Sequence, residues 1–211
     1  MGTRNLTAVM VNGEYKIAQY GQWDGYPSGQ GKTALEFCCG QLATQEGRDA
    51  FRAKLATVRW IKKEEVYAAL TAVGSPDGWL NLDQGRKFDE LCPYLSRNHG
   101  AGILDMVMEA TDDVAISNSI DFAGDSLFCE WAYVIELDKL MLEAYKGFNK
   151  RPVPPGERFA NAPVDERLRG QYYPVRLVGT WSLDALPSFD EFKAQLEPTL
   201  DENVDSTAAA V

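Results

Sequence analysis

Segments with the alternating pattern of β-strands lie near both ends of the chain, and the middle shows helical spacing. Residues 5–20 combine a β-rich run, the turn signal Asn12-Gly13 and a second alternating run, which predict a β-hairpin. Residues 127–145 predict a second hairpin that turns at Asp138-Lys139. This segregation favours an α+β fold over a doubly wound parallel sheet. Because an isolated hairpin is barely stable in water, we expect both to join one antiparallel sheet with the helical middle segment packed on it.

The remaining elements are predicted from the spacing of apolar residues and from residues that mark the ends of helices and strands. Apolar residues recur at helical intervals in six segments, namely 28–42, 48–58, 63–73, 83–95, 100–110 and 187–196. We expect Ser28 to cap the first of these helices. Residues 172–181 predict a last strand, which Pro174 assigns to a sheet edge. The chain is therefore expected to form one α+β domain over residues 1–196, followed by an acidic disordered tail over 197–211.

Charge and composition exclude several classes of protein. The chain has 211 residues, 45% of them hydrophobic, and a formal net charge of −10. Such acidity argues against binding to duplex nucleic acid, which needs a basic face, and against anionic membrane surfaces. No apolar run is long enough for a transmembrane helix, and no signal-peptide pattern opens the chain. The four cysteines lack C-x-x-C spacing, which is typical of a reduced chain in the cytoplasm.

One stretch, residues 19–33, concentrates glycines, aromatics, a proline, an Asp and a Lys. Its end, Gly31-Lys32-Thr33, resembles the end of a P-loop, but Tyr26 stands where that motif needs its first glycine. Three interpretations stay open for the stretch. It is a glycine-rich turn into a helix, a generic anion site at a helix N-terminus, or, least favoured, an NTPase P-loop. Trp23 and Tyr26 either stack on a ligand ring or fill the core.

We predict that the stretch forms a ligand pocket together with the start of the first strand. The hairpin brings the two to the same end of the sheet, so Arg4 and Lys32 could provide positive charge for a ligand. Asp24 could accept hydrogen bonds from a ring of that ligand. The backbone amides of the helix start would attract a negative group. The predicted ligand-binding residues are Arg4, Trp23, Asp24, Tyr26, Ser28, Gly29, Gly31 and Lys32. The competing hypothesis is that Asp24 and Arg4 form a purely structural ion pair.

No metal site, cofactor or catalytic residue is predicted. His99 is the only histidine and is interpreted as a residue that serves the start of a helix. The acidic residues between 112 and 125 match no metal-binding loop and indicate a solvated loop.

Four sequence blocks together resemble a family of phage and large-virus proteins whose function is uncharacterised. The blocks are Met1-Gly-Thr-Arg4, the segment 20–31 with its WDGYPSGQG box, the segment 95–101, and residues 129–148 with the run CEWAYVIELD. The family usually has Gly after the arginine, where this chain has Asn5. Some members resemble N-terminal nucleophile hydrolases in carrying Cys at position 2. Here residue 2 is Gly, and Thr3 would serve as nucleophile only after two residues were removed.

The sequence and this resemblance lead to one main functional hypothesis and two alternatives. The main one is a phage-type cytoplasmic protein that binds a small anionic or nucleotide-like ligand without transforming it, and so sequesters a host signal. The first alternative is a hydrolase of N-terminal-nucleophile-like architecture. The second is an acidic decoy that binds a host protein.

Overall fold

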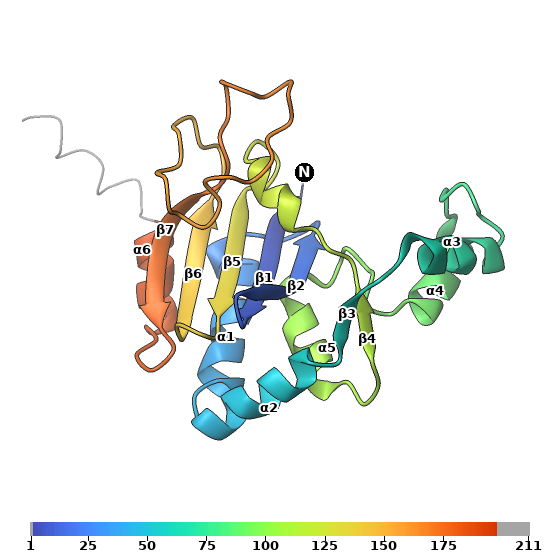
Figure 1. The fold of residues 1–211 in the computed structure, drawn as a ribbon, viewed down its shortest axis with the longest axis horizontal. Coiled ribbons are helices and arrows are strands. Elements are labelled where there is room, and N and C mark those ends of the chain that lie inside the picture. Colours follow the sequence, from blue (N-terminus) through green and yellow to red (C-terminus); the bar gives the residue numbers. More distant parts are fainter. Residues whose placement is uncertain (1, 198–211) are drawn as a thin grey trace, which may run out of the picture.

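The fold is an α+β arrangement around one mixed five-stranded sheet, seen in a computed structural model that describes residues 2–197 (Figure 1). The sheet strands are β1 (Asn5–Val11), β2 (Glu14–Gly21), β5 (Trp131–Glu136), β6 (Met141–Lys146) and β7 (Arg176–Ser182). A small second sheet pairs β3 (Val58–Trp60) with β4 (Val114–Ile116). The α-helices are α1 (Lys32–Gln41), α2 (Gln45–Leu55), α3 (Lys63–Ala72), α4 (Leu82–Leu91), α5 (Ile103–Glu109) and α6 (Phe189–Leu196). A π-helical turn (Pro27–Gly31) and two 3₁₀ turns (Gly100–Gly102 and Ile120–Gly124) complete the elements.

Both predicted hairpins are present and share one sheet, but that sheet is not wholly antiparallel. The strand order is β2-β1-β5-β6-β7, and β1 pairs with β5 in parallel, Asn5 opposite Trp131 and Met10 opposite Glu136. The other three pairings are antiparallel. The expectation of an antiparallel sheet is therefore wrong at its central pairing. Every residue of β5 is buried, as is typical of a strand covered on both faces.

The first hairpin turns where the sequence predicts. Asn12 and Gly13 have φ angles of 55° and 73°, the left-handed pair of a type I′ turn. Their backbone N–H groups both donate to the carboxylate of Asp138, at 2.9 Å each. The turns of the two hairpins are thus held against each other at one end of the sheet.

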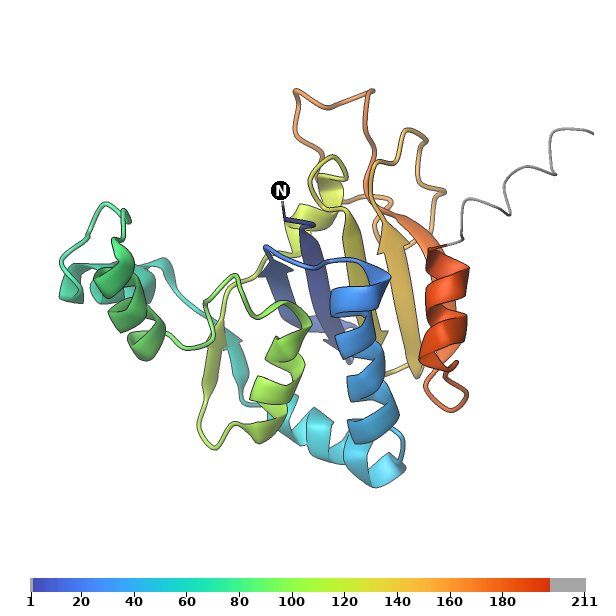
Figure 2. The same cartoon turned by 180° about the vertical axis from the view of Figure 1, so that it is seen from behind.

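Helices α1, α2, α5 and α6 cover one face of the sheet and enclose the main core (Figure 2). Phe37 and Phe51 meet edge to face there, with ring centroids 4.9 Å apart. On the other face a smaller core forms between the sheet and the long connections that precede β5 and β7. Phe159 packs on Tyr145 in this smaller core, with centroids 4.8 Å apart.

Helices α3 and α4 lie apart from the sheet, as Figures 1 and 2 both show. Strand β3 leads into α3, and residues 92–99 lead from α4 back to the body. We call residues 62–98 the helical arm. None of the residues of α3 or α4 is buried, so this part of the predicted helical middle does not pack on the sheet.

Several predicted boundaries move. The segment predicted as a helix over 48–58 ends at Leu55, and Val58 belongs to β3. The last strand starts at Arg176, so Pro174 lies outside it, although β7 is an edge strand as predicted. Ser28 does not cap α1, which follows a π-helical turn and has no side-chain cap. The predicted acidic tail lies outside the described residues, except for Glu197.

No helix in the described part of the chain is long and apolar enough to cross a membrane.

Candidate functional site

The glycine-rich stretch runs along one end of the sheet and is held there by bonds from three distant segments. Gly25 N–H donates to the carbonyl of Thr3 at 2.9 Å, and the Tyr133 hydroxyl donates to the carbonyl of Gly25 at 2.9 Å. From the other side, Ala101 N–H donates to Oε1 of Gln30 at 2.6 Å. The chain start, the box, residues 95–101 and strand β5 therefore meet in space. These are the regions that carry the sequence resemblance.

The amides at the end of this stretch are used inside the loop itself. Gly29 and Gly31 donate to the carbonyl of Tyr26, at 2.9 and 3.2 Å, and the amide of Lys32 donates to Gly29. Gln30 donates to the carbonyl of Asp24 at 2.7 Å. In this conformation these N–H groups already have partners. They therefore do not form the open cradle of amides that the sequence predicted.

Trp23 and Tyr26 are half exposed, at 49% and 50% of their surfaces. The alternative that they fill the core is therefore wrong. The indole Nε1 of Trp23 donates to Oδ1 of Asn98 at 3.1 Å, and part of the ring lies against Gly2.

The charged residues of the predicted pocket contact different neighbours. The Arg4 guanidinium lies over the ring of Phe128, 4.8 Å from its centroid. Lys32 pairs with Glu36 at 3.3 Å and lies 5.4 Å from the ring of Phe189. The structural alternative required an ion pair between Arg4 and Asp24. The ion pairs among the described residues do not include it. Ser28 lies 3.5 Å from Glu197. Ligand binding by this set stays a prediction.

A second location has the charge that an anion needs. A hollow of about 580 Å³ opens between the start of β7 and the loop that follows β6. We call it the basic hollow; the residues that line it are Phe148, Asn149, Lys150, Arg151, Pro152, Val153, Pro154, Glu157, Arg176 and Leu177. Three of these are cations and one is an anion. The ion pairs found in the described chain use none of the three cations, in a protein whose net charge is −10.

Asn149 fixes the loop that carries two of these cations. Its buried side chain donates to the carbonyl of Pro174 at 2.9 Å and accepts from the amide of Arg151 at 3.1 Å. Its own amide donates to the Ser126 hydroxyl at 3.2 Å. Phe148, just before it, adopts a left-handed φ of 51° and exposes 53% of its surface at the rim. The basic hollow thus has a base held by three hydrogen bonds and an accessible aromatic ring.

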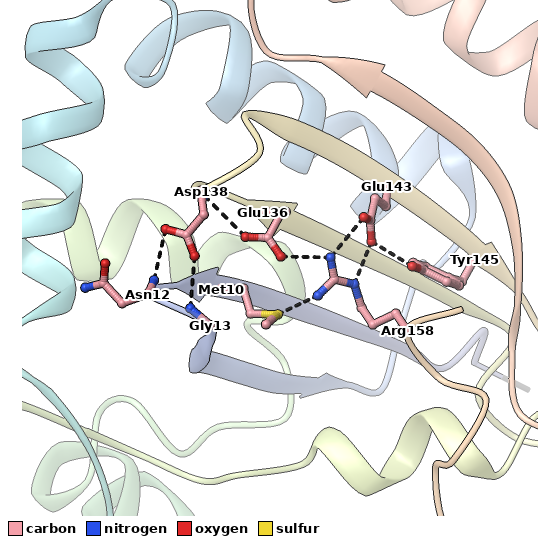
Figure 3. A network of polar contacts seen from close by, with 8 residues as sticks. All are labelled: Met10, Asn12, Gly13, Glu136, Asp138, Glu143, Tyr145 and Arg158. Carbon is pink, nitrogen blue, oxygen red and sulfur yellow. Dashed lines mark hydrogen bonds and ion pairs between the residues drawn. The ribbon is translucent and has the colours of Figure 1, made fainter. Parts of the chain in front are cut away.

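A buried charged cluster lies next to the basic hollow (Figure 3). Arg158 donates to Glu136 at 2.9 Å and to the two oxygens of Glu143 at 2.7 and 2.9 Å. Tyr145 donates to Glu143 at 2.6 Å, and Arg158 also faces the sulfur of Met10. The cluster borders a second hollow, of about 680 Å³, which shares Glu157 and Leu177 with the first.

The cluster shifts the ionisation of its members. Burial alone would raise the pKa of Glu143, but hydrogen bonds from Arg158 and Tyr145 and the charge of Arg158 outweigh it and lower the pKa. Burial and the bond to Glu143 raise the pKa of the Tyr145 hydroxyl. Burial also raises the pKa of Tyr15, although its hydrogen bond with Arg158 acts in the opposite direction. At neutral pH Glu143 is therefore ionised, and the phenols of Tyr145 and Tyr15 are neutral.

Two further sequence candidates are also located. His99 Nε2 lies 2.7 Å from the carbonyl of Pro93, six residues earlier in the chain. Thr3 is buried, and its carbonyl accepts from Gly25. Among the described residues no group of three or more His, Cys, Asp or Glu side chains is arranged to hold a metal ion.

Sequence reasoning missed the basic hollow and the charged cluster. A signal for the cluster was present, because Glu136 is the one charged residue of β5 and Glu143 lies between the apolar residues Leu142 and Ala144 of β6. For the basic hollow, the sequence shows that Lys150 and Arg151 are adjacent. Arg176 joins them only through the β6–β7 pairing, where it lies opposite Lys146.

Comparison with known proteins leaves this geometry as the main guide to function. No protein-family model matches the chain, and neither the curated proteins nor the solved structures contain a match. The resemblance to phage and large-virus proteins stays a prediction.

Proposed function

We propose that the protein binds a small anionic or nucleotide-like ligand in the basic hollow, without transforming it. The observation that carries this proposal is the group Lys150, Arg151 and Arg176, which have no ion-pair partner on the described chain and surround one hollow of a strongly acidic protein. Cations left without an ion-pair partner around a concave site are what a phosphate or carboxylate requires. Its volume of about 580 Å³ lies within the range of small-molecule sites.

The chemistry of the lining supports a ligand with both an anion and a ring. Arginine offers a planar fork that binds two oxygens of a phosphate, and lysine adds a point charge. Phe148 presents an exposed aromatic face at the rim, on which a base could stack. Glu157 is the one acid in the lining and could accept a hydrogen bond from a base or sugar. This combination favours a nucleotide-like ligand over a simple inorganic anion.

Calorimetric titration with ATP, ADP and inorganic phosphate tests the proposal. We expect a nucleotide to bind more tightly than phosphate, and Arg151→Ala and Arg176→Ala each to weaken binding by about tenfold or more, as expected for a lost charge-assisted pair. Arg167→Ala is the matched control, because Arg167 lies outside the basic hollow and is already paired with Asp165 at 2.6 Å. Binding that is unchanged in both hollow variants would contradict the proposal.

The same titration separates the two locations for such a ligand. If the ligand binds at the glycine-rich stretch instead, Lys32→Ala should abolish binding and the two arginine variants should leave it intact. Lys32 already pairs with Glu36, and the nearby amides donate within the loop, so we favour the basic hollow.

The biological role follows as the broader part of the proposal. A binding protein without catalysis suits the sequestration of a host signal, which rests on the resemblance to phage proteins. The four cysteines of the described chain are free thiols, which supports action in a reducing cytoplasm. Mass spectrometry of small molecules released when the purified protein is denatured would identify a ligand retained from cells. Recovery of a hydrolysed product after incubation with nucleotide would favour the hydrolase alternative.

A further inference from the structure

We propose that the helical arm is a docking surface for the arm of a second copy of this chain. The arm contains two helices of ten residues each, and no residue of either is buried. Isolated helices shorter than about 12–15 residues are marginal in water. A projecting pair of short helices without a core of its own therefore needs further apolar contact to stay folded.

The arm also exposes the side chains that such contact would use. Trp79 exposes 84% of its surface and Leu82 exposes 73%, the two largest values among the exposed apolar residues of the described chain. Tyr67 and Leu91, on α3 and α4, expose 59% and 56%. Trp79 and Leu82 border a hollow of about 790 Å³ that Phe88 also lines. Large exposed apolar patches rimmed by polar residues mark interaction sites.

Charge argues that the partner is a second copy. Between residues 62 and 98 the arm carries five basic and six acidic side chains, a net charge of −1. The rest of the chain therefore carries −9 of the total of −10. Two copies would repel each other through their bodies but not through their arms. Because the arms project from the bodies, an arm-to-arm contact also keeps the two acidic bodies apart (Figures 1 and 2).

The exposed face of α4 is self-complementary. Gly85, Arg86 and Asp89 all border the hollow, and the two charged residues belong to no ion pair of the described chain. If two α4 helices lie antiparallel about a twofold axis between residues 87 and 88, each Arg86 faces an Asp89 of the other copy. A twofold contact forms both pairs at once. A side chain at Gly85 would meet nothing within 4 Å, so the backbone there is open to close approach.

Light scattering after gel filtration, over a wide range of protein concentration, tests this proposal on the full chain. We expect the wild type to dimerise reversibly, and Leu82→Glu to weaken the dimer by at least about tenfold. Arg86→Asp should also weaken it, and the double variant Arg86→Asp/Asp89→Arg should restore it. Circular dichroism would check that each variant keeps its helices.

Leu177→Asp is the matched control, since it places a charge at an exposed apolar position of the edge strand β7. If the copies dock through their arms, this variant should dimerise like the wild type. A dimer lost with Leu177→Asp but kept with Leu82→Glu would mean that copies pair through the sheet edge and would overturn the proposal. A wild type that stays monomeric throughout, or a charge swap that fails to restore the dimer, would also overturn it. None of these outcomes depends on the ligand proposed above.

Discussion

Replacing Arg158 with methionine should cost about 3–5 kcal/mol of folding free energy at neutral pH, because it leaves two buried carboxylates without their counter-charge. Arg158 is the guanidinium that both Glu136 and Glu143 contact, at 2.9 and 2.7 Å. The side chains of Glu136 and Glu143 expose only 3% and 13% of their surfaces, so water cannot solvate them in place of the lost guanidinium. Methionine keeps an apolar stem of similar length, which limits the change to the charge and its hydrogen bonds.

The pH dependence of this loss provides a second test, and its sign follows from Glu143. In the wild type its pKa lies below the ordinary value of 4.5, so its contribution is present above that value and is lost as the pH falls through the folded-state pKa. Without Arg158, burial becomes the dominant influence and raises the folded-state pKa. The variant should therefore regain stability relative to the wild type as the pH falls toward 4.5.

Urea unfolding followed by tryptophan fluorescence, at neutral and at mildly acidic pH, measures both effects. The control is Arg167→Met, which removes an exposed ion pair with Asp165 and should change stability by only about 0–1 kcal/mol. A loss below about 1 kcal/mol for Arg158→Met would refute the reasoning, because removal of one member of a buried pair costs more than that. A difference between variant and wild type that does not shrink on acidification would refute the proposed role of Glu143.

Further predictions concern single substitutions. Gly29→Ala should destabilise the fold by about 1–3 kcal/mol, because its Cβ would lie 2.2 Å from the carbonyl oxygen of Asp24. Gly40→Ala, which has open space around it, should stabilise α1 by roughly 0.5–1 kcal/mol, and thermal unfolding measures both changes. Asn149→Ala should cost about 1–3 kcal/mol in urea unfolding, since it leaves the buried carbonyl of Pro174 and the partly buried amide of Arg151 unpaired. Lys32→Ala should shift the melting temperature very little, because its ion pair is exposed.

The sequence predicted the local features of the sheet but not the direction of its central pairing. A turn such as Asn12-Gly13 is specified by residues next to it, and so are the two strands that it joins. The pairing of β1 with β5 depends on the path of the long chain between them, which no local pattern encodes. The nearly continuous apolar run of β5 was the available sign in the sequence, because a strand covered on both faces is typical of parallel pairing.

The small second sheet illustrates a different limit. Strands β3 and β4 have three residues each, too few for a period of two to be told from a period of 3.6. Val58 follows Leu55 at helical spacing, so the pattern assigned it to the preceding helix. Tertiary pairing, in which Val58 lies opposite Val114, decides its conformation instead.

The meeting of the chain start with the box was predicted from the hairpin that joins them, whereas the contact of the box with residues 95–101 was not. The chain path that brings the box, the chain start and residues 95–101 together agrees with the blocks that the sequence singled out. The inward-facing amides were not predictable, since the π-helical turn that uses them has no clear sequence signature. Nor was the role of Asn149, whose partners lie on three separate segments.

The position of Glu136 connects the fold to the proposed site. It is a buried carboxylate at the end of a strand that is otherwise apolar, and such a group is unfavourable in a core unless a cation reaches it. That cation is Arg158, which ends a loop segment that begins at Asn149, within the longer connection from β6 to β7. The loop is therefore held at one end by a buried amide and at the other by a buried ion pair. Lys150 and Arg151 lie between these two points, and fixed ends reduce the ordering that a ligand would have to impose on them.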